Sequence, residues 1–438
     1  MSKNNKISFF VSSLIGLHTA LPYIEEFQKR NINIYLIVPD ALYTSLYKTK
    51  DFKLIKISDI SYKNRFTLML HALMRILFVN EDYSSIYKYW LSQRLQNKKK
   101  WLVQLIRFFQ KILPKWASNQ VNRNLSCWVG ALLANPFPTS KIVAISLPVE
   151  SFLLCSRGIQ VYTIMESWDH PAKAPVGYES QKVFVWNKAL KKDWDHYQGD
   201  QDIRIAYPVK LDYVISLDKH KTTKVIESDN TGMSKVTYMY PTTFGSSSSL
   251  SFFSEEKQLI HKLCHVTQSL GIVLLIKPKP NSRMGELDEF RKYGHVDIGA
   301  YQKNEGGGNY TLEQNYNEAR LKDLEKANLV INLGTTFAID AAAFGLPVLQ
   351  LYIDAPSKFP YLSTIAKYPH LARHLYCYED CIFKIDDDND LTKQFKFLSS
   401  PADHMAQAKQ FSEHLRQWIM PEMTLSEAVE NVVDSILE

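Results

Sequence analysis

Short runs of β-branched, aliphatic and aromatic residues alternate with longer amphipathic stretches along most of the chain. These runs predict strands over Ile7–Val11, Ile34–Val38, Ile142–Ile145, Val161–Ile164 and Val183–Trp186, and over Val236–Tyr240, Ile272–Ile276, Leu329–Asn332 and Val348–Tyr352. Helical patterns separate the apolar runs, which favours parallel sheets covered by helices on both faces. Because the runs fall into two series, we expect an α/β protein with two doubly wound domains and a cleft between them.

A polar stretch divides the two series of strands. Lys, Thr and Asp dominate from Asp218 to about Ser234, a composition typical of a linker. A helical pattern ends the chain, with a break expected at Met420–Pro421 because proline interrupts a helix. The expected organisation is an N-terminal domain over residues 1–215, a linker over 216–234, a C-terminal domain over 235–415, and a helix over 416–438 that packs back toward the N-terminal domain.

Capping signals mark two helices in the second half. Ser254 is expected to cap a helix that ends at Gly271, and Thr336 is expected to cap one that ends at Gly345. Pro347 follows the second helix and prevents its continuation.

One region departs from the alternating pattern. Residues 62–123 are basic, aromatic and helical in pattern, and residues 98–116 combine an apolar stripe with lysines and with Trp101 and Trp116 near the ends. This composition suits a helix lying in a membrane interface beside anionic inner-leaflet lipid. The alternative is an ordinary amphipathic helix packed on its own domain.

Composition narrows the class of protein. The excess of basic over acidic residues is 52 − 45 = +7 in 438 residues, which favours anionic ligands and argues against a nucleic-acid binder. Five cysteines form no even framework and indicate a reducing compartment. Ile7–Val11 is too short for a signal peptide, and no run reaches the roughly 18 apolar residues of a membrane span. We expect a cytoplasmic protein, with a peripheral membrane contact if residues 98–116 bind lipid.

The segment over residues 328–347 carries most information about chemistry. A buried strand ends at Gly334, Thr335 and Thr336 form a turn, and a helix rich in small residues follows. Backbone N–H groups and hydroxyls at such a helix start favour a phosphate, and the carboxylate of Asp340 can accept hydrogen bonds from a ribose diol. A plain strand–turn–helix unit without a ligand is the alternative.

This segment resembles the donor-site signature of GT-B glycosyltransferases. The signature is a strand followed by G-[ST]-[ST]-x-x-x-[DE]-A-x-x-x-G-x-P, and the matching residues are Gly334, Thr335, Thr336, Asp340, Ala341, Gly345 and Pro347. The resemblance implies a GT-B fold with two Rossmann-like domains, the N-terminal one binding acceptor and the C-terminal one binding donor. It also implies that the Gly-Thr turn binds the phosphate of a nucleotide-sugar and that Asp340 binds ribose.

Two lysines follow the strand Ile272–Ile276. The run from Lys277 through Lys279 to Arg283 resembles the K-P-H-P segment of bacterial surface-polysaccharide transferases, which include CMP-sialic acid and CMP-Kdo enzymes, with Lys279 in place of the histidine. Either lysine could neutralise a phosphate as a point charge. The prolines around them also fit a purely structural turn.

A histidine in the N-terminal half is a candidate general base. The stretch from Gly16 through His18 to Pro22, after the first strand, resembles the opening of UDP-glycosyltransferases, where the histidine deprotonates the acceptor hydroxyl. A reference pKa of about 6.5 leaves imidazole neutral and able to accept a proton near pH 7. A structural histidine is the alternative.

A second cluster also follows a predicted strand. The run from Glu166 to His170 resembles the S-W-D segment of surface-carbohydrate transferases. Asp169 or Glu166 could act as the base, while Trp168 and His170 could contact the acceptor sugar. Asp169 could instead cap a turn before Pro171.

Two further motifs carry less weight. Glu305–Asn309 is rich in glycine but lacks the spacing of a phosphate loop. Asp386–Asp388 lies late in the chain, in a predicted turn, so we expect no metal ligand and no cofactor.

These resemblances imply a metal-independent GT-B glycosyltransferase that moves a sugar from a UDP- or CMP-sugar donor to a growing bacterial surface glycan, in a capsule or a lipopolysaccharide O-antigen. The implied acceptor is a glycan or a lipid-linked glycan. Three alternatives remain: a CDP-polyol phosphotransferase of the teichoic-acid type, a sugar-nucleotide 2-epimerase, and a non-catalytic assembly protein.

Overall fold

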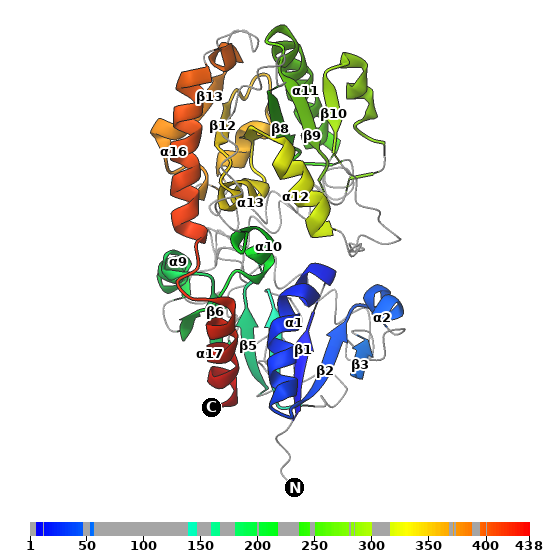
Figure 1. Cartoon of the computed structure of the whole chain (residues 1–438), viewed down its shortest axis with the longest axis vertical. Coiled ribbons are helices and arrows are strands. Elements are labelled where there is room, and N and C mark those ends of the chain that lie inside the picture. Colours follow the sequence, from blue (N-terminus) through cyan, green and yellow to red (C-terminus); the bar gives the residue numbers. More distant parts are fainter. Residues whose placement is uncertain are drawn as a thin grey trace, which may run out of the picture. The chain divides into compact units, whose positions relative to one another are not determined.

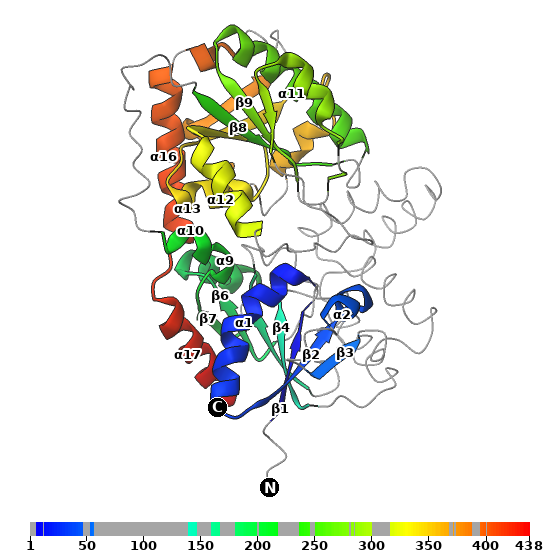
Figure 2. The same ribbon diagram turned by 45° about the vertical axis from the view of Figure 1, so that its right-hand side comes forward.

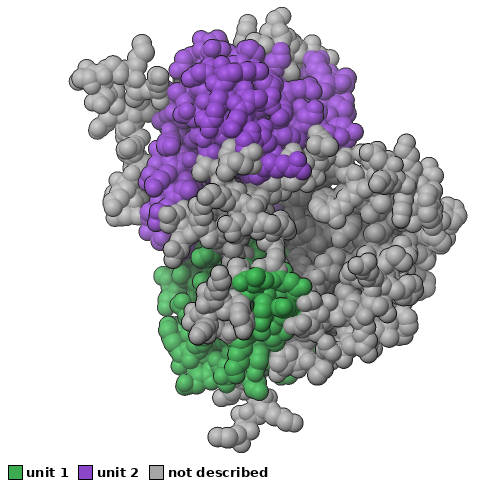
Figure 3. Space-filling model, turned by 90° about the vertical axis from the view of Figure 1, so that its right-hand side faces the viewer, with its two compact units in different colours: residues 1–210, 421–438 green, residues 211–420 purple. Residues whose placement is uncertain are grey.

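The computed structural model divides into two compact units, residues 1–210 with 421–438 (unit 1) and residues 211–420 (unit 2), which Figure 3 colours separately. The structure describes residues 6–11, 13–46, 53–56, 139–146, 159–166, 180–198, 201–217, 236–245, 250–279, 282–283, 285–299, 316–367, 371, 374–387, 395–399 and 401–438. Outside these ranges lie the basic region predicted over 62–123, with its lipid-binding segment 98–116, most of the predicted linker, Glu305–Asn309, and the candidate residues Trp168, Asp169 and His170.

Unit 1 contains a parallel sheet of seven strands in the order β3-β2-β1-β4-β5-β6-β7. The strands are β1 Lys6–Phe10, β2 Asn33–Val38, β3 Lys53–Lys56, β4 Lys141–Ile145, β5 Gln160–Ile164, β6 Lys182–Val185 and β7 Ile203–Ile205. The described helices are α1 Leu14–Lys29, α2 Asp40–Leu46, α9 Lys188–Gln198 and α17 Leu425–Leu437. Figure 1 shows α1 and α17 side by side against this sheet.

Alternate residues of the strands of unit 1 form two apolar layers. Phe9 and Val143 join the layer that also contains α1 and α17, whereas Phe10 and Ala144 join the layer on the opposite face. Side chains of successive strand residues point to opposite faces, so strands that are apolar at every position can be buried on both.

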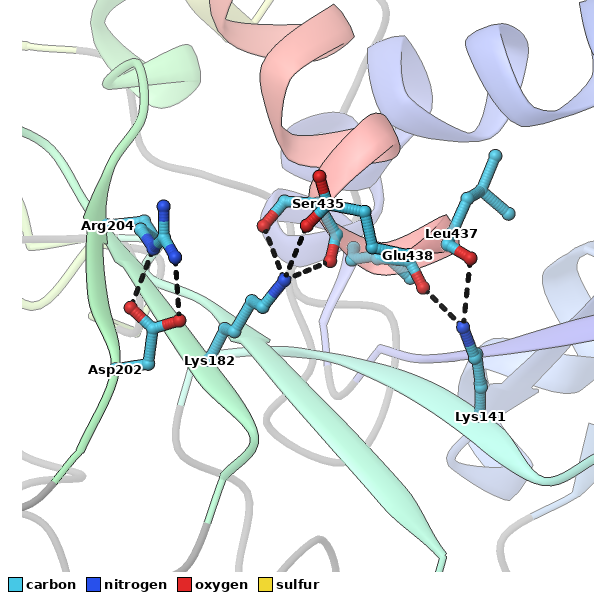
Figure 4. Close-up of polar contacts among 8 residues, drawn as sticks. Lys141, Lys182, Asp202, Arg204, Ser435, Leu437 and Glu438 are labelled. Carbon is cyan, nitrogen blue, oxygen red and sulfur yellow. Dashed lines mark hydrogen bonds and ion pairs between the residues drawn. The ribbon is translucent and has the colours of Figure 1, made fainter.

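The final helix, α17, contacts the rest of unit 1 with its apolar face and with its C-terminal end. Val432 and Val433 of α17 lie in the same apolar layer as α1. At the end of α17, Lys141 donates to the carbonyl of Ile436 (2.6 Å), and Lys182 donates to the carbonyl and hydroxyl of Ser435 (Figure 4). The last carbonyls of a helix have no partner within it, and positive charge is favoured there.

Unit 2 contains a parallel sheet of six strands in the order β10-β9-β8-β11-β12-β13. Figure 2 shows β8 and β9 side by side in this sheet. The strands are β8 Thr237–Pro241, β9 Val273–Lys277, β10 Val296–Ile298, β11 Leu329–Asn332, β12 Val348–Asp354 and β13 Ile382–Asp386. The described α-helices are α10 Asp212–Ile215, α11 Leu250–Ser269, α12 Tyr316–Lys326, α13 Phe337–Phe344 and α16 Pro401–Ile419. The short 3₁₀ helices of unit 2 are η4 Asp288–Tyr293, η5 Leu362–Lys367, η6 Glu379–Cys381 and η7 Phe395–Ser399, and a further one, η2 Val209–Leu211, spans the boundary between the units.

The nine predicted strands and the fold class of two doubly wound sheets are confirmed. The break near Pro421 is confirmed as well, because α16 ends at Ile419 and α17 begins at Leu425. Among the described residues, none of the helices is both long enough and apolar enough to span a membrane.

Of the two predicted N-terminal caps, Ser254 is wrong and Thr336 is correct in position only, and both helices end near the predicted glycines. Gly271 and Gly345 adopt positive φ angles, +69° and +94°. Gly345 directly follows α13, and Gly271 lies two residues after the end of α11. Ser254 is inside a helix rather than at its cap, because α11 already begins at Leu250. Thr336 occupies the cap position of α13 but its side chain makes no capping bond, and Thr335 Oγ1 instead accepts from the N–H of Phe337 (3.2 Å).

Candidate functional site

The order of the strands in unit 2 reverses between β8 and β11. In an open parallel sheet, ligands bind outside the carboxyl ends of the strands at such a switch point. Two segments meet there: the β8 loop (Thr242–Gly245) and the Gly334 turn (Leu333–Thr336). The turn is the one that the sequence motif singles out, so structure and motif indicate the same place.

The Gly334 turn is tightly packed and internally bonded. A Cβ at Gly334 would lie 2.8 Å from Ile365 Cγ2 and 3.7 Å from Thr243 Cγ2, so only glycine fits between these neighbours. Asn332 Oδ1 accepts from the N–H of Thr335 (3.2 Å), and the amide of Asn332 donates to buried Gln350 (2.7 Å). The shape of the turn is therefore set before any ligand binds.

At the start of α13, Thr336 is exposed. Its hydroxyl makes no capping bond and lies at the positive end of the helix dipole. The arrangement can place a hydroxyl and a partial positive charge against an anionic group.

Asp340 points into the protein. Its carboxylate is 4% exposed, accepts from the hydroxyl of Tyr213 (2.8 Å) and forms an ion pair with Arg320. The guanidinium of Arg320 also lies 5.1 Å from the centre of the Tyr213 ring. Asp340 thus joins α13 to α10 and α12, and binding of ribose by the same carboxylate stays a prediction.

The two candidate lysines lie in different surroundings. Lys277 is buried in an ion pair with Asp323 of α12, and burial lowers its pKa while Asp323 raises it. Lys279 belongs to the switch point: its N–H donates to Thr242 Oγ1 (2.8 Å) and its Nζ donates to the carbonyl of Thr243 (2.9 Å). Burial lowers the pKa of Lys279, and nearby Glu256 opposes this shift.

Two acidic residues of this region were missed in the sequence. Glu255 and Glu256 are 7% and 0% exposed and accept hydrogen bonds from backbone amides near the Gly334 turn. The sequence could have indicated that they are buried, because they lie one helical turn before Leu259 and Ile260, within the apolar stripe of α11. Two carboxylates in a buried stripe require partners, and they therefore mark a structured polar site.

In unit 1 the strand order reverses between β1 and β4, and one predicted base lies there. A Cβ at Gly16 would be 3.3 Å from Glu166 Oε2, and the hydroxyl of Ser146 donates to the same oxygen (3.3 Å). Ser13 Oγ accepts from the N–H of Gly16 (2.9 Å) and caps α1. Glu166 therefore lies beside the start of α1.

His18, the other described candidate base, is exposed on α1. Desolvation by the surrounding protein lowers the pKa of His18 below its ordinary value. The lowered pKa favours the neutral imidazole, which is the form that accepts a proton. Asp169, Trp168 and His170, the remaining candidates in unit 1, lie outside the described residues.

Comparison with known proteins gives a fold but no relative in sequence. No family model matches the chain, and no curated protein matches it. Among solved structures, the UDP-GlcNAc 2-epimerase from Neisseria meningitidis, bound to UDP-GlcNAc, aligns over 99% of each chain with a TM-score of 0.50 and 11% identity.

Two glycosyltransferases align as well. MurG from Acinetobacter baumannii covers 98% of this chain and 99% of its own, with a TM-score of 0.47 and 11% identity. CalG4, the calicheamicin glycosyltransferase, covers 100% of this chain and 99% of its own, with a TM-score of 0.47 and 10% identity. At these identities the likeness concerns the fold alone, and the two parallel sheets of seven and six strands, each flanked by helices, are the two Rossmann-like domains of the GT-B fold.

Proposed function

We propose that this protein is a GT-B glycosyltransferase that moves a sugar from a UDP- or CMP-sugar to a growing bacterial surface glycan, in a capsule or a lipopolysaccharide O-antigen. The observation that supports it most is the Gly334 turn, which carries the donor-site signature and lies at the switch point of unit 2. The chemistry of that position, a helix start with an exposed hydroxyl, suits the phosphate of an activated sugar.

In the proposed reaction, the donor phosphate lies against Thr336 and the start of α13. Lys279, two residues after the neighbouring strand β9, adds positive charge close to the switch point. Fixed dipoles and charges of this kind stabilise negative charge that develops on the leaving nucleotide. We propose that they suffice without a metal ion, so that the reaction needs no cofactor.

Unit 1 supplies the general base. His18 is our first candidate, because its lowered pKa keeps the imidazole neutral, and Glu166 is the second, because it lies at the strand ends of that unit. The base removes a proton from the acceptor hydroxyl as the bond from the sugar to the nucleotide breaks. Asp169, Trp168 and His170 remain candidates for the base or for acceptor contacts.

The test is binding followed by turnover with the full-length protein. Isothermal titration with UDP, CMP, CDP and GDP identifies the nucleotide that the protein binds. The corresponding nucleotide-sugars are then incubated with and without a lipid-linked glycan fraction. Release of free nucleotide that requires acceptor supports transfer. A change in the sugar without acceptor indicates an epimerase, release of CMP from a CDP-polyol indicates a phosphotransferase, and failure of all four nucleotides to bind contradicts the proposal.

We also propose a peripheral position on the cytoplasmic face of the inner membrane, through residues 98–116. The support is the sequence itself, in which lysines, arginine and two tryptophans surround an apolar helical stripe. Sedimentation with vesicles that contain phosphatidylglycerol, but not with vesicles of phosphatidylcholine alone, is the expected result. Failure to sediment with either kind of vesicle would contradict this proposal.

A further inference from the structure

Two adjacent glutamates on α11 are buried beside the switch point of unit 2. Glu255 is 7% exposed and Glu256 is fully buried. Burying a carboxylate is costly unless hydrogen bonds satisfy it, and both of these side chains accept from backbone N–H groups. Each glutamate accepts hydrogen bonds from the amides of a different loop.

Glu256 holds the β8 loop. Its carboxylate accepts from the N–H of Thr243 (2.6 Å), from the N–H of Phe244 (2.8 Å) and from the hydroxyl of Tyr240 (3.0 Å). Lys279 Nζ donates to the carbonyl of the same Thr243 (2.9 Å). Two charged side chains thus fix both backbone polar groups of Thr243, and charge-assisted hydrogen bonds are the stronger kind.

Glu255 holds the η5 loop (Tyr361–Ile365), which follows β12. Its two carboxylate oxygens accept from the N–H of Tyr361 (3.1 and 3.0 Å), and Oε2 also accepts from the N–H of Leu362 (2.9 Å), at the start of η5. Residue Ile365 of this loop packs against Gly334.

The two loops contribute two of the three nearest neighbours of Gly334, and the third is Leu371, whose Cδ1 lies 3.7 Å from a Cβ built there. Measured from a Cβ built on Gly334, Ile365 Cγ2 lies at 2.8 Å and Thr243 Cγ2 at 3.7 Å. A shift of either loop by a few tenths of an ångström would therefore change the space around the turn. Consecutive residues of one helix hold the two loops that supply Ile365 and Thr243.

We propose that Glu255 and Glu256 are positioning residues of the donor site, each holding one of the two loops that flank Gly334 in the shape that binds the phosphate of the activated sugar. This inference rests on the proposed function of the Gly334 turn. Neither carboxylate needs to touch the donor, because each acts through the loop whose amides it accepts from.

The same geometry makes donor binding sensitive to pH. The charged and titratable groups that face Glu256 are Tyr240 on β8 and Lys279 after β9, together with the two amides of the β8 loop. Burial raises the pKa of Glu256 to about 7, and the hydrogen bonds and Lys279 oppose that rise. Protonation places an O–H opposite N–H donors, so a bond to the loop is lost as the pH falls through about 7.

The glutamine variants Glu255→Gln and Glu256→Gln test the inference, because an amide cannot accept through both of its ends. Glu289→Gln is the matched control: Glu289 is a more exposed acid on η4 that pairs with Lys257 of α11, away from both loops. Melting temperatures of all variants are measured first, and hydrogen exchange is compared in the full-length, unliganded protein.

The expected result separates the two glutamates. Glu256→Gln speeds exchange about tenfold in the amides of the β8 loop only, and Glu255→Gln does so in the η5 loop only. Each variant weakens nucleotide binding by about tenfold or more. Wild-type binding weakens below pH 7, and this pH dependence is smaller in Glu256→Gln. The nucleotide's own titration affects both proteins alike, so it does not account for the difference.

Unchanged exchange in both loops would overturn the positioning role, and so would faster exchange with nucleotide affinity unaltered. If the wild-type protein binds no nucleotide at all, the proposed function fails, and the exchange data still decide whether the two glutamates hold these loops.

Discussion

At the scale of single residues, we expect the hydroxyl of Thr243 to lower the stability of the protein and to favour binding of nucleotide. Within the described part of the chain, its hydroxyl is buried and has no hydrogen-bond partner, whereas its amide and carbonyl are both held. A buried hydroxyl without a partner costs free energy, and a residue at a ligand site commonly bears such a cost.

Thr243→Val removes the hydroxyl and keeps the shape of the side chain. We expect the free energy of unfolding to rise by about 1 kcal/mol, because an unsatisfied polar group is lost, while nucleotide affinity falls several-fold. Urea denaturation and isothermal titration measure the two quantities. Thr243→Ser, which retains the hydroxyl, should keep the affinity, and a valine variant with full affinity would show that the hydroxyl has no part in binding.

The exposed imidazole of His18 gives a second prediction at this scale. His18→Ala should lower kcat by ~10²–10⁴ and leave nucleotide affinity nearly unchanged, because the base acts on the acceptor. Since the pKa of His18 is lowered, the neutral form persists to a lower pH, and the wild-type rate should fall only below the ordinary pKa of histidine. Retained turnover in the alanine variant would transfer the role to Glu166, for which Glu166→Gln is the corresponding test.

At the scale of elements, the glycine of the Gly334 turn is required by packing rather than by its backbone angles. Gly334→Ala places a methyl group 2.8 Å from Ile365 Cγ2, so the η5 loop must move. We expect a loss of about 1–3 kcal/mol in stability and a loss of nucleotide binding. In a double-mutant cycle with Ile365→Ala, the double variant should lose less stability than the sum of the single ones, and simple additivity would contradict the contact.

The end of α17 offers a prediction confined to unit 1. Lys182 donates to the last turn of this helix and also pairs with Glu438 (3.2 Å). Lys182→Met should lower the stability of unit 1 by about 1–2 kcal/mol, because helix carbonyls lose a charged partner. Lys188→Met removes a lysine whose side chain is 80% exposed in its pair with Glu422, and it should cost less than 1 kcal/mol.

Strand burial explains how much of this fold could be predicted from sequence. The central strands are apolar at almost every position, so their runs predicted them, whereas β3, β7, β10 and β13 were missed, and each of these is an edge strand. An edge strand has one unpaired side and is buried less, so Lys53–Lys56 keeps a lysine at each end and Val296–Ile298 spans only three residues. Hydrophobic periodicity carries little information at such positions.

The candidate site was predictable in part for a related reason. Local motifs indicated the Gly334 turn and Lys279, because they are continuous in sequence. The partners of Asp340 were not indicated, since Tyr213 and Arg320 come from α10 and α12, 127 and 20 residues away in sequence. Contacts of that kind follow from the packing of helices, which a single sequence does not specify.

At the scale of the whole molecule, the chain crosses between the units twice, after Lys210 and after Met420. Each unit has its own sheet and buried core, so calorimetry should resolve contributions from two transitions. A nucleotide that binds at the Gly334 turn stabilises only the unit that contains it, by RT ln(1 + [L]/Kd).

We therefore expect a nucleotide at about 100 times its Kd to raise the stability of unit 2 by roughly 2.7 kcal/mol, with the transition of unit 1 little changed. Lys182→Met should shift the other transition, so the two perturbations assign the two peaks. The proposed absence of a metal requirement adds a sharper condition. The shift and the transfer rate should both persist in excess EDTA, because the start of α13 and Lys279 supply the positive potential and Thr336 supplies a hydroxyl donor. Loss of the shift on chelation, with recovery on addition of Mg²⁺ or Mn²⁺, would show that a cation completes the donor site.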